Sequence, residues 1–252
     1  MIRRMDDTAM IINPTREKGE PELPAAGILL INPAEAAAGL RLAKNRNARR
    51  LFLFNSKLAE IPATPPAGSF FVAGPAVGSP MAVLTLEKLV VLGARRIIVY
   101  GWCGSLRATL RIGDVLLPTW AISDEGTSAH YPASSQPESH APSRQLLADG
   151  LIAQGLTVHT GPVWTTDAPY RESTTQVSRL GGQGILGVDM EYAALVAAAT
   201  FRKVELTAVQ LVSDELWSGK WNPGFRTKAF KKKSSDILHF LTDFCSSLSA
   251  AK

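Results

Sequence analysis

The feature that most constrains the fold is an alternation of short apolar runs with segments of helical periodicity. Residues 27–31 (GILLI) form a continuous apolar run, and residues 96–100 (RIIVY) form a second, the pattern of strands buried within a sheet. Between them, residues 69–72 predict another strand, followed by a turn rich in glycine and proline and a helix with Val83 and Leu86 on one face. Because such alternation requires right-handed crossovers, the sequence predicts an α/β domain with a largely parallel sheet.

The rest of the chain contains the same kinds of element in a more mixed order. Further strands are predicted at residues 51–54, 114–118, 157–159 and 206–212. Further helices are predicted at residues 34–48, 144–154, 191–200 and 226–248, with surface loops at 62–66 and 123–143. Residues 1–26 are charged and proline-containing, and we expect a partly flexible arm there, with one domain over residues 27–252.

Composition excludes several classes of protein. A hydrophobic fraction of 46% with 19% charged residues excludes a mostly disordered chain. The net charge is +5, but the basic residues are scattered, so no nucleic-acid partner is predicted. With two cysteines, no signal-peptide pattern and no apolar run of about 20 residues, we expect a cytoplasmic protein without a membrane partner. The four histidines show no metal-ligand spacing, so no metal site is expected.

Two glycine-containing segments follow predicted strands. Residues 74–79 would offer backbone N–H groups to an anion, or would simply form a tight turn that needs glycine. Residues 101–104 (GWCG) end a buried strand, where ligands of α/β sheets bind. We interpret Cys103 as a packed side chain rather than a nucleophile, because no histidine or asparagine partner is identifiable near it.

The strongest local signals are carboxylates in apolar surroundings. Asp189 and Glu191 lie in GVDMEY at the start of a predicted helix, and Asp214 follows a predicted buried strand. A carboxylate in such a setting is costly unless it is capped or used. We predict that Asp189 caps the helix, whereas Glu191 and Asp214 have functional roles.

Taken together, these segments resemble the nucleoside phosphorylases, the family of bacterial purine nucleoside and uridine phosphorylases and related nucleosidases. The matching stretches, in the family's order, are LEKLVVLGARRIIVYGWCGSL, IGDVLLP, DEGTSAHYP, DAPY, GVDMEYAAL and LVSDEL. They extend over residues 27–248. Several matches in order make the resemblance more specific than any single motif.

The resemblance implies a single α/β domain with a central mixed, partly barrel-like β-sheet flanked by helices. It implies assembly into a homo-oligomer, from dimer to hexamer, and cleavage of the N-glycosidic bond of a nucleoside with transfer of the pentose to phosphate. Inorganic phosphate would be the co-substrate, and no other cofactor is implied.

The resemblance also implies roles for individual residues. Glu191 would accept hydrogen bonds from the ribose hydroxyls, and Met190 would pack against the sugar. Asp214 would protonate the purine N7, assisted by Arg226 on the last helix. The base pocket would be formed by Cys103, Gly104, Tyr170 and Asp214. The presence of Asp214 favours a purine over a pyrimidine.

The phosphate half departs from the family pattern. Residues 31–36 (INPAEA) lack the family's arginine, Val99 stands where a second phosphate-binding arginine is usual, and Trp102 replaces a small hydroxyl residue. The remaining candidates for the phosphate or nucleophile site are Gly78, Ser79 and Trp102. Replacement charges could come, within the chain or from a neighbouring subunit, from Arg41, Arg46, Arg49 and Arg50.

Three functions therefore remain open. The first is a phosphorylase, the second is a phosphate-independent nucleosidase on the same scaffold, and the third is a nucleoside-binding protein with weak or no catalysis. Glu191 and Asp214 favour catalysis, whereas Val99 and Trp102 favour a departure from the standard reaction.

Overall fold

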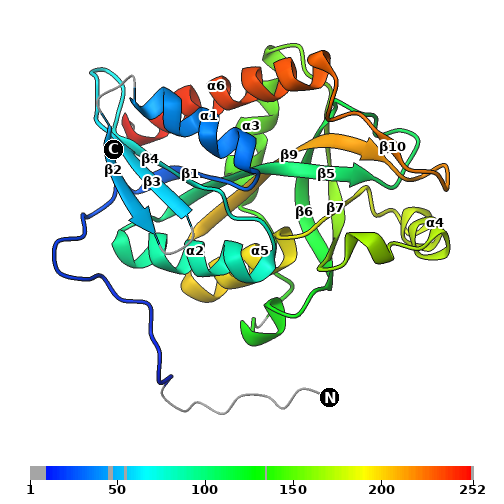
Figure 1. Cartoon of the computed structure of the whole chain (residues 1–252), viewed down its shortest axis with the longest axis horizontal. Helices are drawn as coiled ribbons and strands as arrows, with labels where there is room; N and C mark the ends of the chain where they lie inside the picture. The colour runs from blue at the N-terminus through cyan, green and yellow to red at the C-terminus, as the bar shows by residue number, and fades with distance from the viewer. Residues whose placement is uncertain (1–9, 45–47, 54–55, 134, 251–252) are drawn as a thin grey trace.

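The structure is a computed structural model that describes residues 10–44, 48–53, 56–133 and 135–250. A mixed β-sheet runs through the molecule, with helices on both faces (Figure 1). The strands are β1 (Ala26–Leu30), β2 (Arg49–Leu53), β3 (Ser56–Ile61), β4 (Phe70–Gly74), β5 (Arg96–Ser105), β6 (Val115–Asp124), β7 (Val158–Thr166), β8 (Gly187–Asp189), β9 (Glu205–Glu215) and β10 (Asn222–Pro223). The helices are α1 (Pro33–Lys44), α2 (Ser79–Leu92), α3 (Ala141–Ala153), α4 (Thr174–Gly182), α5 (Tyr192–Arg202) and α6 (Lys228–Ala250), with short 3₁₀ turns η1 (Ser128–His130) and η2 (Pro169–Arg171).

Part of the sheet closes into a ring. Strand β5 pairs with β9 on one side and with β8 on the other, while β9 pairs with β6, β6 with β7 and β7 with β8. The remaining strands continue from β5 in the order β1, β4, β3 and β2 as an open wing. The predicted mixed, partly barrel-like sheet is confirmed, and the ring brings the ends of β5, β8 and β9 together.

Two apolar layers cover the sheet. Helices α2 and α5 lie on one face, and α1, α3 and α6 lie on the other (Figure 1). Strand β5 contributes side chains to both layers. Val99 and Cys103 pack in the layer with α2 and α5, while Tyr100 and Trp102 pack in the layer with α1, α3 and α6. The side-chain alternation of a strand therefore decides that Trp102 faces α6 and Cys103 faces away from it.

Several elements differ from those predicted. Strands β5, β6, β7 and β9 are longer than predicted, and all four pair within the ring. Strand β3, strand β8 and helix α4 were not predicted, since they are short and lack a long periodic pattern. Helix α6 begins at Lys228 rather than at residue 226. Phe54 of a predicted strand, residues 45–47 of a predicted helix and residues 1–9 of the arm lie outside the described residues.

None of the described helices combines the length and the apolar character that crossing a lipid bilayer would need.

An ion pair joins helices α2 and α5. The Arg202 guanidinium of α5 donates from Nε to Glu87 Oε2 at 2.6 Å and from Nη2 to Oε1 at 2.9 Å. The Glu87 side chain on α2 is only 9% exposed. Because the pair is bidentate and one partner is buried, it fixes α2 against α5.

We expect Arg202→Met to destabilise the fold by about 2–3 kcal/mol, because it removes the cation that pairs with the buried Glu87 carboxylate. Urea unfolding of the variant measures this. As a control, Lys232→Met removes an exposed pair with Asp236, and its cost should stay below about 0.5 kcal/mol. Equal losses in the two variants would show that the Glu87 pair is no stronger than a surface pair.

Candidate active site

The sugar side of the predicted site is built where α2 begins. The backbone N–H of Gly78 donates to Glu191 Oε1 at 2.6 Å, and Ser79 Oγ donates to the carbonyl of Met190 at 2.7 Å. Glu191 and Ser79 are both buried. The structure therefore brings four of the predicted site residues together from two distant parts of the chain.

This arrangement changes the interpretation of the glycine turn before α2. The sequence leaves two interpretations of this turn, an anion site or a tight turn that needs glycine, and in the structure the N–H of Gly78 binds the Glu191 carboxylate. The positive end of the α2 dipole favours this negative partner. Ser79 is likewise committed to Met190, so the role of Gly78 and Ser79 at phosphate remains only a prediction.

Asp189 forms a buried network behind Glu191. Thr165 Oγ1 donates to its Oδ1 at 2.6 Å, and the Tyr192 backbone N–H and Gln210 Nε2 each donate to its Oδ2 at 2.8 Å. The contact with Tyr192 satisfies an N–H at the start of α5, as expected of a capping residue. Asp189 thus fixes the segment that presents Met190 and Glu191.

The Asp189–Glu191 pair is electrostatically costly. Burial raises the pKa of Glu191, and the neighbouring Asp189 charge raises it further, while the N–H of Gly78 opposes the shift. Burial also raises the pKa of Asp189, against the hydrogen bonds from Thr165, Tyr192 and Gln210. A carboxyl group held in this way becomes fully charged more easily when a ligand supplies further donors.

The base side of the site lies at the end of β9. A β-bulge in the β5–β9 ladder leaves Ser213 unpaired and sets Asp214 opposite Gly104. A Cβ added to Gly104 would come within 2.5 Å of Leu216 Cδ1, 3.1 Å of Val188 Cγ1 and 3.3 Å of Asp214 Oδ2, so only a glycine lets these side chains pack against β5 here. Ser213 Oγ donates to Asp214 Oδ1 at 2.5 Å, and Trp221 Nε1 donates to Oδ2 at 2.9 Å.

Two residues of this region were missed by the sequence analysis. Trp221 binds Asp214 directly. Glu172, half-buried after η2, has its pKa raised to about 7, first by burial and then by the charge of Asp214. Neither residue lies in a recognisable motif. The only signals in the sequence were that Glu172 is polar, that Trp221 is aromatic, and that each lies close to a segment that resembles the family.

Other predicted residues are not brought to Asp214. Arg226 is exposed and precedes α6, with its guanidinium 5.7 Å from the Phe225 ring centroid. Tyr170 is fully exposed on η2. Across the described ranges, neither side chain makes a hydrogen bond with Asp214, so their catalytic and base-binding roles remain predictions.

Cys103 and Trp102 point to opposite layers. The Cys103 thiol is buried, and burial raises its pKa well above the usual value, which is consistent with a packed side chain. The Trp102 ring stacks on Phe225 and meets Phe230 edge-on. Its buried Nε1 has no hydrogen-bond partner among the described residues.

The segment that departs from the family pattern holds a buried carboxylate. Ser234 Oγ donates to Glu35 Oε1 at 2.6 Å, while Glu35 Oε2 and Asn32 Oδ1 are buried and unpartnered within the described chain. Both residues lie in or beside the first turn of α1. The structure thus places hydrogen-bond acceptors, rather than cations, in this segment.

The described arginines that are candidates for replacing the missing phosphate-binding charges lie on α1 and β2. Arg41 is exposed in the last turn of α1, and Arg49 and Arg50 are exposed on β2. Strands β5, β1, β4 and β3 lie between β2 and β9, so Arg49 and Arg50 are several strands away from Asp214. Arg46 lies outside the described residues.

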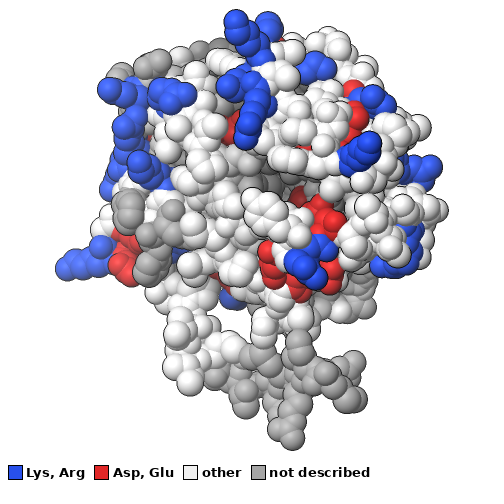
Figure 2. Space-filling model, turned by 45° about the vertical axis from the view of Figure 1, so that its right-hand side comes forward, with Lys and Arg blue, Asp and Glu red and all other residues white. Residues whose placement is uncertain are grey.

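The surface agrees with this distribution of charge. Figure 2 shows a hollow near the middle of one face, bordered by carboxylates, with most of the lysine and arginine side chains nearer the edges. Within the described ranges, no group of three or more histidine, cysteine or acidic residues could hold a metal ion.

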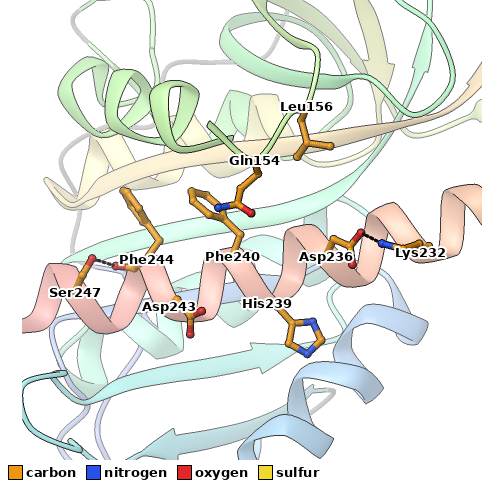
Figure 3. Close-up of a pocket in the computed structure, with 9 residues that line it drawn as sticks. All are labelled: Gln154, Leu156, Lys232, Asp236, His239, Phe240, Asp243, Phe244 and Ser247. Atoms are coloured by element: carbon orange, nitrogen blue, oxygen red, sulfur yellow. Dashed lines mark hydrogen bonds and ion pairs between the residues drawn. The ribbon is translucent and has the colours of Figure 1, made fainter. Parts of the chain in front are cut away.

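A second groove lies along α6 and is separate from the site. Its walls include Phe240 and Phe244 of α6, with Gln154 and Leu156 from the segment after α3 (Figure 3). It contains none of the predicted catalytic residues.

Comparisons with known proteins agree with the fold and with the predicted family. The family model of the Phosphorylase superfamily matches residues 29–244. A guanosine phosphorylase of Halorubrum lacusprofundi is 28% identical over 163 residues, which cover 64% of this chain and 67% of that protein. A DeoD-type purine nucleoside phosphorylase of Bacillus thuringiensis is 30% identical over 152 residues, which cover 59% of this chain and 65% of that protein. The match therefore spans about two thirds of the length of these relatives.

Solved structures show the same fold. Purine nucleoside phosphorylase from Toxoplasma gondii, in complex with immucillin-H, superposes with a TM-score of 0.79 at 19% identity and covers 97% of this chain and 99% of its own. Uridine phosphorylase from Vibrio fischeri ES114 gives a TM-score of 0.79 at 16% identity, covering 95% of this chain and 100% of its own.

We expect Glu191→Gln to stabilise the ligand-free protein increasingly as pH rises. The raised folded-state pKa of Glu191 means that ionising this group costs folding free energy, so the wild type loses stability above the unfolded-state value. Thermal unfolding between about pH 5 and pH 9 measures the difference. The exposed Glu138→Gln variant is the control. Unfolding temperatures that differ from wild type by the same amount at every pH would contradict this account.

Proposed function

The chain belongs to the phosphorylase superfamily, and we propose that it cleaves the N-glycosidic bond of a purine nucleoside and transfers the pentose to phosphate. The observation that carries the proposal is the joint presence of Glu191, held against α2, and Asp214, set beside Gly104. These two carboxyl groups suit the two ends of the bond that must break.

Glu191 serves the sugar end. Its carboxylate accepts hydrogen bonds from the ribose 2′- and 3′-hydroxyls, and its negative charge stabilises the oxocarbenium character that the sugar acquires as the bond lengthens. Met190, half-buried beside it, offers an adaptable apolar surface to the ring. The hydroxyls supply the donors that offset the cost of ionising Glu191 in its buried place.

Asp214 serves the base end. In its protonated form it gives a proton to the purine N7, so that the base leaves as a neutral molecule. Ser213 and Trp221 hold its two oxygens. A pyrimidine has no N7, and this favours purine nucleosides as substrates.

The acceptor is phosphate in the first candidate function. The protein needs no organic cofactor, and its two cysteines, both free and buried, suit a reducing compartment such as the cytoplasm. Cations for phosphate would come from a neighbouring subunit of a homo-oligomer, because the start of α1 supplies Glu35 and Asn32 rather than a cation.

Hydrolysis is the second candidate, favoured by one specific observation. Val99 is buried in the apolar layer, and Glu35 Oε2 and Asn32 Oδ1 are acceptors without a partner among the described residues, in the segment where the family carries anion-binding groups. Each missing charge-assisted pair forfeits about 1.5–3 kcal/mol of phosphate binding. Neutral water does not need these cations and would then act as the nucleophile.

The acceptor is decided by assaying inosine, adenosine, methylthioadenosine and uridine with and without phosphate. Phosphorolysis predicts free base and pentose 1-phosphate from the purine nucleosides only when phosphate is present. Equal release without phosphate would establish the hydrolase instead. Preference for uridine would contradict the role of Asp214, and binding without any release would indicate a nucleoside-binding protein.

We expect Asp214→Asn to lower kcat on the purine nucleoside by about 10²–10⁴-fold with a much smaller change in KM, because the amide cannot donate the required proton. Steady-state kinetics measure both constants. The exposed Asp236→Asn variant is the matched control and should retain wild-type turnover. An unchanged kcat in Asp214→Asn would remove this residue from the mechanism.

A further inference from the structure

The Asp214 carboxyl group is held by two uncharged donors. Ser213 Oγ occupies one oxygen at 2.5 Å, and the indole N–H of Trp221 occupies the other at 2.9 Å. A carboxyl oxygen held on one side by a fixed donor has a defined direction for its remaining lone pair or proton. The two bonds therefore set the plane of the group beside Gly104.

Trp221 is held in turn by the backbone of β9. Its neighbours Asn222 and Pro223 form β10, which pairs with Glu215 and Asp214. The N–H of Gly224 donates to the carbonyl of Ser213 at 2.8 Å. The segment that carries the indole is thus fastened to the same strand that carries the carboxyl group.

Aromatic contacts connect Trp221 to the core. Its ring lies 6.2 Å from that of Phe225, which stacks on Trp102 at 5.9 Å, and Trp102 meets Phe230 edge-on at 5.1 Å. Trp221 is 62% exposed. Its contact with Phe225, which connects through Trp102 to the buried ring of Phe230, restrains an indole that would otherwise move freely in solvent. Trp102, which stands where the family usually has a small hydroxyl residue, therefore has a structural role in this row of aromatic rings.

The chemistry of an indole differs from that of a cation. A guanidinium beside a carboxyl group favours the ionised form, which has no proton to give. An indole N–H orients the group without adding charge, and in this structure the Arg226 guanidinium lies over Phe225 instead. Glu172 adds a further carboxyl group rather than a cation to the surroundings of Asp214.

We propose that Trp221 is the positioning residue that aims the Asp214 carboxyl group for proton donation to the purine. The inference rests on the proposed function of Asp214. As the C1′–N9 bond breaks, its electron pair moves into the base, and the Asp214 proton transfers to N7. The carboxylate that forms keeps the hydrogen bond from Trp221, which retains its own proton, and Asp214 is reprotonated from solvent.

The test uses Trp221→Phe, which removes the N–H and keeps an aromatic ring for Phe225. The kcat on inosine should fall about 10–100-fold with little change in KM, because the acid is present but misdirected. Trp217→Phe is the matched control: this nearby ring lies under Arg111, and Asp214 takes its donors from other residues, so kcat should be unchanged.

A second substrate separates positioning from packing. The leaving group of 4-nitrophenyl β-ribofuranoside departs without a proton, so Trp221→Phe should cleave it at the wild-type rate. Loss on both substrates, or wild-type kcat on inosine, would overturn the role of Trp221. If Asp214→Asn is impaired on inosine and Trp221→Phe is not, only this inference fails. If Asp214→Asn is itself unimpaired, the acid function falls and the inference falls with it.

Discussion

The hydrogen bond from the N–H of Gly78 to the Glu191 carboxylate is the contact on which the site depends. It joins the start of α2 to the segment between β8 and α5, and Ser79 reinforces it through Met190. A buried carboxylate is unfavourable by itself, and the helix N-terminus supplies both a donor and a favourable dipole. The ion pair between Glu87 and Arg202 then keeps the same two helices together.

The closed part of the sheet gives this contact its surroundings. Strand β7 supplies Thr165 and strand β9 supplies Gln210, and both side chains bind Asp189 behind the sugar site. On the base side, the bulge at Ser213 turns Asp214 toward Gly104. One ring of strands therefore orients both carboxyl groups, although they belong to different elements.

The two halves of the site differ in charge. The sugar and base halves are rich in oriented carboxyl groups, whereas the segment at the start of α1 contributes Glu35 and Asn32 and no cation. Trp102 packs on Phe225 and Phe230 in the layer that covers the sheet on the side of α6. In the proposed site, the residues assigned to the nucleoside match the family pattern, whereas the segment at the start of α1 does not.

The sequence by itself determined the α/β alternation and singled out Glu191 and Asp214 as candidate site residues, because periodicity and motif order are local properties. Only the tertiary structure decided that the N–H of Gly78 binds Glu191, that β5 and β9 close the ring and that Trp221 reaches Asp214. These contacts join residues whose partners are selected by strand register, a bulge and side-chain direction. Strand register, a bulge and side-chain direction are not encoded in a local sequence pattern, so these contacts could be identified only in the folded structure.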